Sequence, residues 1–351
     1  MNVAAILPSR NEPATIAAVT RAVDAALDDA RAVIVHADSS DTSDTIERFA
    51  ATSTRAAKLP LVALARGKGA QILAASGRPE ISDAEAVLIA DTDTLTPDPA
   101  IYRALLDRVR SGYGLVIADY PRHWDEANLT NHLARPLIAA ATGHDVPQPL
   151  AGDLALSRDV LTVVRQAADA LSEPLSACVD GYGIDTFVLL TAAAHGPVTS
   201  VRFDQSKRHA GSFPHLSAIY HEAVPVLLHM TAAWNPAPAP RGDGPAPYRA
   251  ADRELPPGRL KSMLATLDDL SPFSPSGYDE YPWPLPAADA WRAVASGTPA
   301  TDAARQLWPH YTHRVRNWLT SNQYATTRQR AQELAVAHTR LHAALTSAGA
   351  P

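Results

Sequence analysis

The sequence predicts an α/β protein with a mostly parallel central sheet and helices on both of its faces, followed by a mainly helical C-terminal region. Three observations support this fold class. Short apolar runs alternate with amphipathic helical patterns in the first part of the chain, and each run ends at a polar cluster. The stretch from Thr301 to about Ser347 carries apolar residues at helical spacing. Alternating strand and helix patterns are typical of a parallel sheet.

The first strand–helix unit shows this alternation clearly. Residues 2–8 form a short apolar run that ends at a proline, which predicts a buried strand. A polar turn follows over residues 9–13. The helix expected over residues 14–27 places four apolar side chains on one face, namely Ile16, Val19, Val23 and Leu27.

The same patterns predict the remaining elements. Further strands are expected over residues 32–36, 61–64, 86–90, 114–118 and 198–203. Helices are expected after a polar loop at 38–43, from residue 67 onward, and over 129–141. The expected buried positions near the C-terminus are Leu307, Val315, Trp318, Leu334, Leu341 and Leu345. Proline-rich loops are expected over residues 235–247 and 272–286. Ligands of such sheets bind beyond the carboxyl ends of the strands, where the polar clusters lie.

Composition and charge exclude several classes of protein. The chain has 351 residues, of which 46% are hydrophobic and 19% are charged, so it can form a substantial core. A net charge of -6 argues against a nucleic-acid-binding protein. The single cysteine, Cys178, excludes an internal disulfide framework and a cysteine-rich zinc site. Because the sequence has no basic leader and no apolar run of about 18 residues, we expect a soluble cytoplasmic protein without a membrane span.

Asp91-Thr92-Asp93 is the only D-x-D motif of the chain, and it directly follows an apolar strand. Two carboxylates at such a strand end suit a hard divalent cation, which prefers oxygen ligands and can carry a diphosphate. The alternative is that these carboxylates cap the following helix. The position at the end of a buried strand favours a metal site.

Two further clusters are candidates for binding a nucleotide. Residues 66–69, Arg-Gly-Lys-Gly, would let backbone amides at a helix start approach a phosphate, and Lys68 would add a positive charge. The chain has only four lysines, so a lysine in a glycine-rich loop is notable. Residues 8–12, Pro-Ser-Arg-Asn-Glu, would hold a base or a ribose. The alternatives are an ordinary glycine turn and a plain turn with exposed charges.

Three candidates lie farther along the chain. Residues 148–153, Gln-Pro-Leu-Ala-Gly-Asp, combine rigid and small residues, so their backbone amides would line a pocket. Asp185 stands at a predicted helix start, where an aspartate most often caps the helix. His209 follows a predicted strand, and a lone histidine is more often an ordinary surface or core residue than a ligand.

Taken in order, these motifs resemble those of the GT-A glycosyltransferases, most closely the retaining mannosylglycerate synthase and glucosyl-3-phosphoglycerate synthase group. The resemblance covers residues 3 to about 215 and rests on residues 7–12, the loop at Asp38, and residues 67–69, 91–93, 148–153, 183–186 and 207–209. It implies a Rossmann-like GT-A catalytic domain over residues 1–215. Residues 216–351 would then form a helical region that completes the acceptor side or an oligomer interface, such as that of a homodimer.

The resemblance also implies a role for each motif. A divalent metal ion, Mn²⁺ or Mg²⁺, is expected at Asp93 and His209. Asp185 and Asp91 are expected near the reacting centre, with Asp91 facing ribose, sugar or metal-bound water. The residues expected to bind the nucleotide sugar are Pro8, Ser9, Arg10, Asn11, Glu12, Asp38, Lys68, Asp91, Thr92, Gln148, Leu150, Ala151, Gly152 and Asp153.

The implied reaction transfers a hexose from a GDP- or UDP-linked donor to a small hydroxyl acceptor with retention of configuration. The acceptor hydroxyl would attack on the leaving-group side and pass its proton to a diphosphate oxygen, while the metal and Lys68 stabilise the leaving diphosphate. Ala151 and Asp153 stand where the family's motif has a glycine and a glutamate, which alters the floor of the sugar or acceptor pocket. Residues 120–124 match neither synthase, which suggests a different acceptor.

Three other interpretations compete with this one. The segment from Asp91 to Leu95 also fits the D-x-D-x-T pattern of haloacid-dehalogenase-like phosphatases, in which the first aspartate is the nucleophile. Those enzymes usually carry it on the first strand, whereas here three strand–helix units precede it. A nucleotidyltransferase would need a glycine-rich N-terminal signature, which residues 7–11 lack. A non-catalytic nucleotide-sugar-binding protein is the third alternative, and a measurement of turnover separates it from an enzyme.

Overall fold

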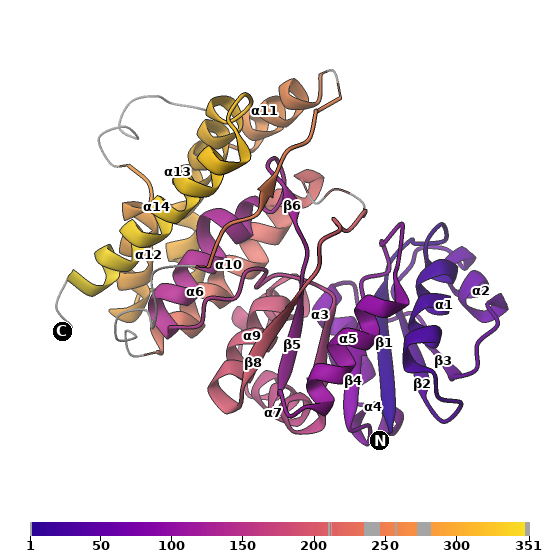
Figure 1. Cartoon of the computed structure of the whole chain (residues 1–351). Coiled ribbons are helices and arrows are strands. Elements are labelled where there is room, and N and C mark those ends of the chain that lie inside the picture. Colours follow the sequence, from indigo (N-terminus) through magenta and orange to yellow (C-terminus); the bar gives the residue numbers. More distant parts are fainter. Residues whose placement is uncertain are drawn as a thin grey trace. The chain divides into compact units, whose positions relative to one another are not determined.

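The structure is a computed structural model that describes residues 2–209, 211, 213–234, 246–256, 258–271 and 282–347 (Figure 1). It contains two compact units. The first consists of residues 1–120 and 150–210, and the second of residues 121–149 and 211–351. From the sequence we expected one continuous domain up to residue 215. In the structure, residues 121–149 leave the first unit between two of its strands and cluster with the C-terminal residues instead.

A seven-stranded sheet forms the centre of the first unit, with the strand order β3-β2-β1-β4-β7-β5-β8 (Figure 1). β7 is antiparallel to both of its neighbours, and the other strands pair in parallel. The expected mostly parallel sheet is therefore confirmed. The strands are β1 Val3–Ser9, β2 Val33–Asp38, β3 Ala57–Leu61, β4 Ala86–Ile89, β5 Leu115–Asp119, β7 Leu154–Ser157 and β8 Val198–Arg202.

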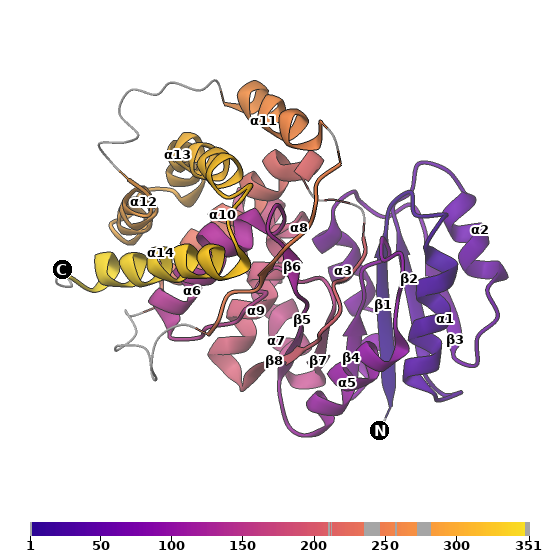
Figure 2. The same ribbon diagram turned by 45° about the horizontal axis from the view of Figure 1, so that its top comes forward.

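Helices cover both faces of this sheet, as expected (Figure 2). Val3, Ala5 and Leu7 of β1 lie in one hydrophobic core with side chains of α1, α2 and α5. Because side chains alternate along a strand, Ala4 and Ile6 face the opposite side, where α3 contacts β1. The helices are α1 Ile16–Leu27, α2 Asp44–Ala51, α3 Lys68–Ser76, α4 Pro79–Ser82, α5 Pro99–Arg110, α7 Arg158–Asp169, α8 Leu175–Asp180 and α9 Gly183–His195.

Two strands differ from the sequence prediction. We expected the third strand over residues 61–64, but β3 spans Ala57–Leu61. Lys58 and Pro60 interrupt the apolar pattern there, and both are accommodated because β3 is an edge strand. Lys58 Nζ donates to the backbone oxygen of Phe49 at the end of α2, at 2.9 Å. The strand β7 was not predicted, since it has only four residues and enters the sheet after the 121–149 segment.

The second unit is built mainly from helices, which confirms the expected helical C-terminal region. We expected one helix over residues 129–141, and the chain instead forms a π-helical turn at Thr130–Ala134 that continues into α6. The predicted buried positions from Leu307 to Leu345 are all buried. The elements are β6 Arg122–His123, α6 Arg135–Thr142, a 3₁₀ turn at Phe213–His215, α10 Leu216–Ala232, β9 Ala250–Ala251, α11 Arg259–Leu270, α12 Leu285–Ala295, α13 Ala300–Ser321 and α14 Thr327–Ser347.

Buried aromatic and arginine side chains hold this second unit together. Trp318 Nε1 donates to the backbone oxygen of Trp124 at 2.7 Å. The guanidinium of Arg330 lies over the Trp124 ring, 4.8 Å from its centroid. Arg135 is also buried and lies 4.0 Å from the centroid of the Tyr248 ring. These contacts tie the 121–149 segment to the C-terminal helices, which explains why it clusters with them.

Among the described residues, no helix has the length and apolar character needed to cross a bilayer. The two proline-rich loops expected at 235–247 and 272–286 lie mostly outside the described residues.

Candidate functional site

The candidate residues gather at the carboxyl ends of parallel strands in the first unit. β1 ends at Ser9, β2 ends at Asp38, and the D-x-D loop follows β4. Thr92 Oγ1 donates to the backbone oxygen of Pro8 at 2.7 Å, which ties the D-x-D loop to the end of β1. All predicted site residues belong to this unit except Gln148, which is buried in the second unit.

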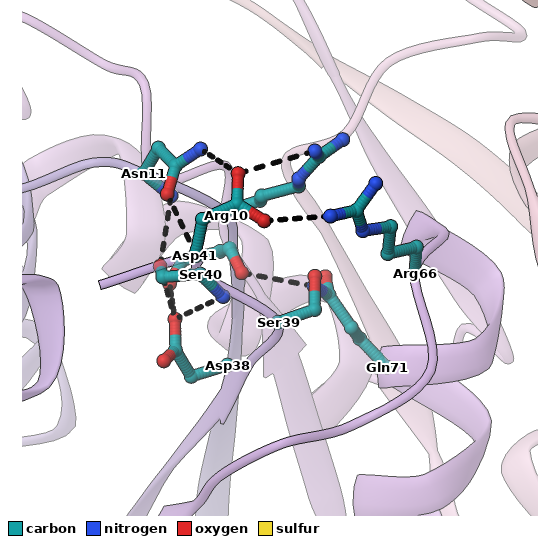
Figure 3. Close-up of polar contacts among 9 residues, drawn as sticks. Arg10, Asn11, Asp38, Ser39, Ser40, Asp41, Arg66 and Gln71 are labelled. Atoms are coloured by element: carbon teal, nitrogen blue, oxygen red, sulfur yellow. Dashed lines mark hydrogen bonds and ion pairs between the residues drawn. The ribbon is translucent and has the colours of Figure 1, made fainter. Parts of the chain in front are cut away.

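Asp38 is buried at the end of β2, and one of its carboxylate oxygens is held by several donors (Figure 3). Oδ1 accepts hydrogen bonds from Ser9 Oγ at 3.1 Å and Ser40 Oγ at 2.6 Å. His36 Nε2 lies 2.6 Å from Ser9 Oγ. Burial lowers the pKa of His36 to about 4, with only partial opposition from the Asp38 charge, so this histidine is neutral at pH 7. Gln71 Nε2 donates to the backbone oxygen of Ser9 at 2.9 Å and closes the network.

Four exposed polar residues contact one another around Asp41, in the loop that follows β2. We call Arg10, Asn11, Asp41 and Arg66 the exposed cluster (Figure 3). Asn11 Nδ2 donates to the Asp41 carboxylate, and Asp41 N donates to Asn11 Oδ1, both at 2.9 Å. Arg10 and Arg66 form ion pairs with Asp41 at 3.3 and 2.8 Å. The Asp41 side chain is 45% exposed and that of Arg66 69%, so a ligand can reach these groups and displace the contacts.

Lys68 lies at the start of α3 and bridges two carboxylates. Its Nζ lies 2.9 Å from Asp185 Oδ1, in the first turn of α9, and 3.2 Å from Asp91 Oδ1. A Cβ atom on Gly69 would lie 1.8 Å from the backbone oxygen of Val179, so only glycine permits this approach of α3 to the end of α8. The Lys68 side chain is only 17% exposed. Residues 66–69 are therefore not an ordinary glycine turn with a solvated lysine, which was the alternative interpretation of this motif.

Lys207 contacts the other carboxylate oxygen of Asp91. Its Nζ lies 2.9 Å from Asp91 Oδ2 and 2.9 Å from Asp153 Oδ2. Asp153 also accepts hydrogen bonds from Tyr120 OH at 2.8 Å and, through Oδ1, from Asp91 N at 3.0 Å. These side chains therefore form a row of ion pairs in which acidic and basic groups alternate. We call this row the buried cluster, and its members in order are Asp185, Lys68, Asp91, Lys207 and Asp153.

The loop before β7 presses directly against this cluster. Leu150, Ala151 and Gly152 form that loop. A Cβ atom on Gly152 would lie 1.9 Å from Asp91 Oδ1, so this position requires a glycine for lack of space. Glu12 follows β1, where Thr15 Oγ1 donates to its carboxylate at 3.1 Å, and its negative charge acts on Asp93.

Asp93 and His209 face each other beside the buried cluster. Thr94 and His209 form an isolated antiparallel bridge, and Leu95 N donates to the backbone oxygen of Arg208 at 2.8 Å. This backbone pairing between the D-x-D loop and residues 207–209 leaves His209 Nδ1 at 3.8 Å from Asp93 Oδ2.

Burial has the largest influence on the ionisation of these acids, and neighbouring charges add to it or oppose it. Burial raises the pKa of Asp93 to about 7, and the negative charge of Asp91 adds to this effect. Burial also raises the pKa of Asp185 to about 6, although Lys68 opposes it. Burial would raise the pKa of Asp91 as well, but Lys207 and Lys68 outweigh it and hold that pKa well below its usual range. Asp93 is therefore the carboxylate at which an added cation would relieve most repulsion.

The donor set of Asp93 and His209 fits a divalent transition metal, which accepts both carboxylate oxygen and imidazole nitrogen. Within the ranges that the structure describes, no group of three or more His, Cys, Asp or Glu side chains is arranged to hold a metal ion. A cation at this pair would therefore take its remaining ligands from water and from substrate phosphates, as Mg²⁺ commonly does.

Sequence reasoning missed two members of this arrangement. Lys207 lies in the motif at 207–209, and its only signal was the scarcity of lysine in the chain. Tyr120 gave no signal, because nothing in its local sequence indicates that its hydroxyl meets Asp153. Both depend on contacts between residues more than 30 positions apart, which no local pattern reports.

Searches against known proteins identify relatives of part of the chain. No protein-family model matches it. The glucosyl-3-phosphoglycerate synthases of Mycobacterium tuberculosis and Mycobacterium bovis are each 29% identical over 212 residues. The match covers 54% of this chain and 60% of each relative, so the chain spans less than two thirds of the length of these curated relatives.

Solved structures are similar over a larger share of the chain. The M. tuberculosis glucosyl-3-phosphoglycerate synthase in complex with Mn²⁺, UDP-glucose and phosphoglyceric acid has a TM-score of 0.53 and 25% sequence identity, over 66% of this chain and 79% of that one. The same enzyme in complex with Mg²⁺ and UDP has a TM-score of 0.51 and 24% identity, again over 66% and 79%. The predicted resemblance to this group and the predicted GT-A fold are both confirmed.

Proposed function

We propose that this chain is a metal-dependent glycosyltransferase that moves a hexose from a UDP-linked donor to a hydroxyl group of a small acceptor, with retention of configuration. The observation that carries the proposal is the Asp93–His209 pair beside Lys68 and Asp91, at the carboxyl ends of β1 and β4. A pair of metal ligands next to a lysine suits a diphosphate, whose charge both would neutralise.

The nucleotide would bind at the ends of β1 and β2. Asp38 Oδ1 already accepts bonds from Ser9 and Ser40, which leaves Oδ2 to accept an N–H group of the base. Uracil and guanine both offer such a group, so GDP remains the alternative to UDP. Pro8 and Ser9 would present backbone groups to the base or ribose, and Arg10, Asn11 and Glu12 would line the open side.

Mn²⁺ or Mg²⁺ would be held by Asp93 and His209, the latter through Nδ1. When bound, the ion supplies positive charge that stabilises the leaving nucleoside diphosphate. The raised pKa of Asp93 supports this assignment, because burial and then the charges of nearby acids disfavour its negative charge, which a bound cation would offset.

Lys68 would stabilise the negative charge that develops on the diphosphate as the bond to the sugar breaks. Asp185 is held by Lys68, so it would orient the acceptor or stabilise the oxocarbenium-like centre rather than attack the sugar. Asp91 and Thr92 would face the ribose and the sugar. Because Asp91 and Asp185 are each paired with a lysine, a diphosphate oxygen is the better base for the acceptor proton, and this favours retention by attack on the leaving-group side.

The acceptor would meet the donor sugar near the loop of Leu150, Ala151 and Gly152, which precedes Asp153. The binding role of Gln148 stays a prediction from the sequence. Phosphoglyceric acid is the first acceptor to test, because the similar mycobacterial synthase was solved with it. UDP-glucose is the first donor for the same reason. Another small hydroxyl compound is the alternative acceptor, since Ala151, Asp153 and residues 120–124 depart from the family's pattern.

The phosphatase interpretation is less favourable. Its nucleophile would be Asp91, but each carboxylate oxygen of Asp91 is paired with a lysine, Lys68 on one side and Lys207 on the other. A non-catalytic nucleotide-sugar-binding protein would share the donor site, and only turnover distinguishes it from an enzyme.

The first test is thermal unfolding of the purified chain with UDP or GDP, each with Mn²⁺ and each with EDTA. A ligand that binds only the folded state raises the unfolding temperature by mass action. We expect a metal-dependent rise with UDP, its loss in Asp93→Asn, and its retention in Asp107→Asn, a matched change at an exposed aspartate of α5. No rise with either nucleotide, with or without metal, contradicts the donor site.

The second test is turnover of UDP-glucose with phosphoglyceric acid, followed by analysis of the product's anomeric configuration. Transfer with an α-configured product supports a retaining enzyme. Binding of UDP without turnover of any sugar donor would support the non-catalytic interpretation instead.

A further inference from the structure

Both carboxylate oxygens of Asp153 are bonded to groups of the protein, and the side chain has no exposed surface. Oδ1 accepts the hydrogen bond from Asp91 N at 3.0 Å. Oδ2 accepts the hydrogen bond from Tyr120 OH at 2.8 Å and forms the ion pair with Lys207 at 2.9 Å. The Asp153 side chain is fully buried, with an exposed fraction of 0%. Because the side chain is fully buried, a sugar or acceptor hydroxyl could reach it only if the surrounding protein groups moved.

Lys207 is enclosed in the same way. Its side chain is 6% exposed, and its ammonium lies between Asp91 Oδ2 and Asp153 Oδ2, 2.9 Å from each. The Tyr120 ring lies 5.9 Å from Nζ and covers one side of it. Lys68, on the opposite side of Asp91, is more exposed, at 17%. The two lysines therefore differ in access, because Lys68 can meet a ligand and Lys207 faces only protein.

These contacts fix Asp91 from three directions. Asp153 holds its backbone N–H, Lys207 holds Oδ2, and Lys68 holds Oδ1. The Asp91 carboxylate also packs against the backbone of Gly152, where a Cβ atom would lie 1.9 Å from Oδ1. Burying two lysines among carboxylates costs desolvation energy that a hydrophobic cluster would not cost. An arrangement with this cost can serve to fix the orientation of one charged group.

We propose that Lys207 and Asp153, supported by Tyr120, are positioning residues that act as one unit: they fix the orientation of Asp91 and of the D-x-D loop and do not contact donor or acceptor. The inference rests on the proposed transferase function. It assigns Asp153 a different role from the substrate-binding one that the sequence motif implied. The sugar would then be recognised by other groups, with Asp91 and the backbone of the 150–152 loop the nearest candidates.

The test measures steady-state kinetics of Lys207→Met, Asp153→Asn and the double variant against the wild-type chain. Lys58→Met serves as the matched control, because Lys58 also bonds only to protein, at the end of α2, and lies outside the proposed site. We expect each single variant to lower kcat at least about 30-fold and the two variants to have donor KM values within about threefold of each other, because both act through Asp91. We expect the double variant to be no more than about threefold worse than either single variant.

The conservative variants separate positioning from a general loss of folding. Lys207→Arg keeps the charge between the two carboxylates, so we expect it to recover at least about tenfold of the activity that Lys207→Met loses. Tyr120→Phe removes one hydrogen bond and should lower kcat by about three- to tenfold, with a change in the donor KM no larger than in the two single variants.

The outcomes distinguish this inference from the proposed function. A donor KM raised more than tenfold in only one of Asp153→Asn and Lys207→Met overturns it, because a contact made by that residue alone would then bind the donor. Multiplicative losses in the double variant, or full activity of both single variants, also overturn it while leaving the transferase function intact. A wild-type chain that turns over no sugar nucleotide overturns the proposed function, and the inference fails with it.

Discussion

The exposed cluster around Asp41 and the buried cluster around Asp91 lie at the same edge of one sheet, yet they are built in opposite ways. In the exposed cluster an aspartate pairs with arginines whose side chains are 46% and 69% exposed. In the buried cluster the two lysines are 17% and 6% exposed and each bridges two carboxylates. Both contain ion pairs, but only the second is enclosed by protein.

The difference indicates what each cluster is for. Exposed ion pairs contribute little to stability, and a ligand can replace them at low cost, which suits a surface that adapts to a nucleotide. Buried ion pairs lose hydration and gain stability only when every partner is present, so removing one leaves an uncompensated charge. The buried cluster should therefore be sensitive to any single change, and the exposed cluster tolerant of it.

The largest expected effect is that of Lys68→Met. The change removes the one lysine of the buried cluster that can meet a diphosphate and leaves Asp185 and Asp91 each without a cation on one side. We expect turnover to fall at least about 100-fold, as for loss of other groups that stabilise a developing negative charge. Steady-state kinetics of the variant beside Lys58→Met check this, and equal activity of the two variants would remove Lys68 from the mechanism.

Gly152→Ala tests how tightly the buried cluster is packed. The new methyl group would lie 1.9 Å from Asp91 Oδ1, so either the loop or the carboxylate must move. We expect the free energy of unfolding to fall by about 1–3 kcal/mol, the usual range for overpacking. Gly196→Ala is the control, because a Cβ atom there meets nothing within 4 Å. Urea unfolding of the two variants should separate them, and indistinguishable curves would mean that the loop yields freely.

His36 lies beneath the exposed cluster but is itself buried, so it should give a marked pH dependence. Burial holds its folded-state pKa near 4, below the ordinary value of 6.5. Between these values the unfolded chain binds a proton that the folded chain does not, so stability falls as pH drops through this window. We expect the wild type to lose about 2 kcal/mol more than His36→Gln between pH 7 and 4.5. Urea unfolding at both pH values measures this, and parallel losses in the two proteins would contradict it.

The smallest expected effect is that of Asp41→Asn in the exposed cluster. Its ion pairs with Arg10 and Arg66 are open to water, and Asn11 can still bond to the new amide. We expect the midpoint of thermal unfolding to change by no more than about 2 °C. A larger decrease would show that the exposed cluster does not tolerate a single change better than the buried cluster.

Local sequence patterns were sufficient for most of the sheet and for the position of the candidate site. β1, β2, β4 and β5 are short apolar runs, and a buried parallel strand needs little else to be recognised. The expectation of polar residues beyond these strands follows from the same reasoning, because the carboxyl ends of parallel strands share one edge. Asp91, Asp93 and Lys68 were all found in this way, since each stands directly after a strand or at a helix start.

The contacts among those residues could be seen only in the tertiary structure. β7 was missed because its four residues carry no distinctive pattern and its antiparallel direction depends on where the 121–149 segment returns. β3 was misplaced because Pro60 is tolerated only at an edge, and a strand's place in a sheet cannot be read from its own residues. Lys207 was missed because its partners, Asp91 and Asp153, lie 116 and 54 positions away in the chain, 207 − 91 and 207 − 153.

The sequence by itself thus determined the strand–helix order and the kinds of side chain at the edge of the sheet, because hydrophobic periodicity and turn chemistry act over a few residues. The pairing of Asp93 with His209, and the enclosure of Asp91 between two lysines, were decided by the tertiary structure. Ion pairs between distant segments depend on how loops approach one another, and the energy of each pair depends on a burial that exists only once the whole unit has folded.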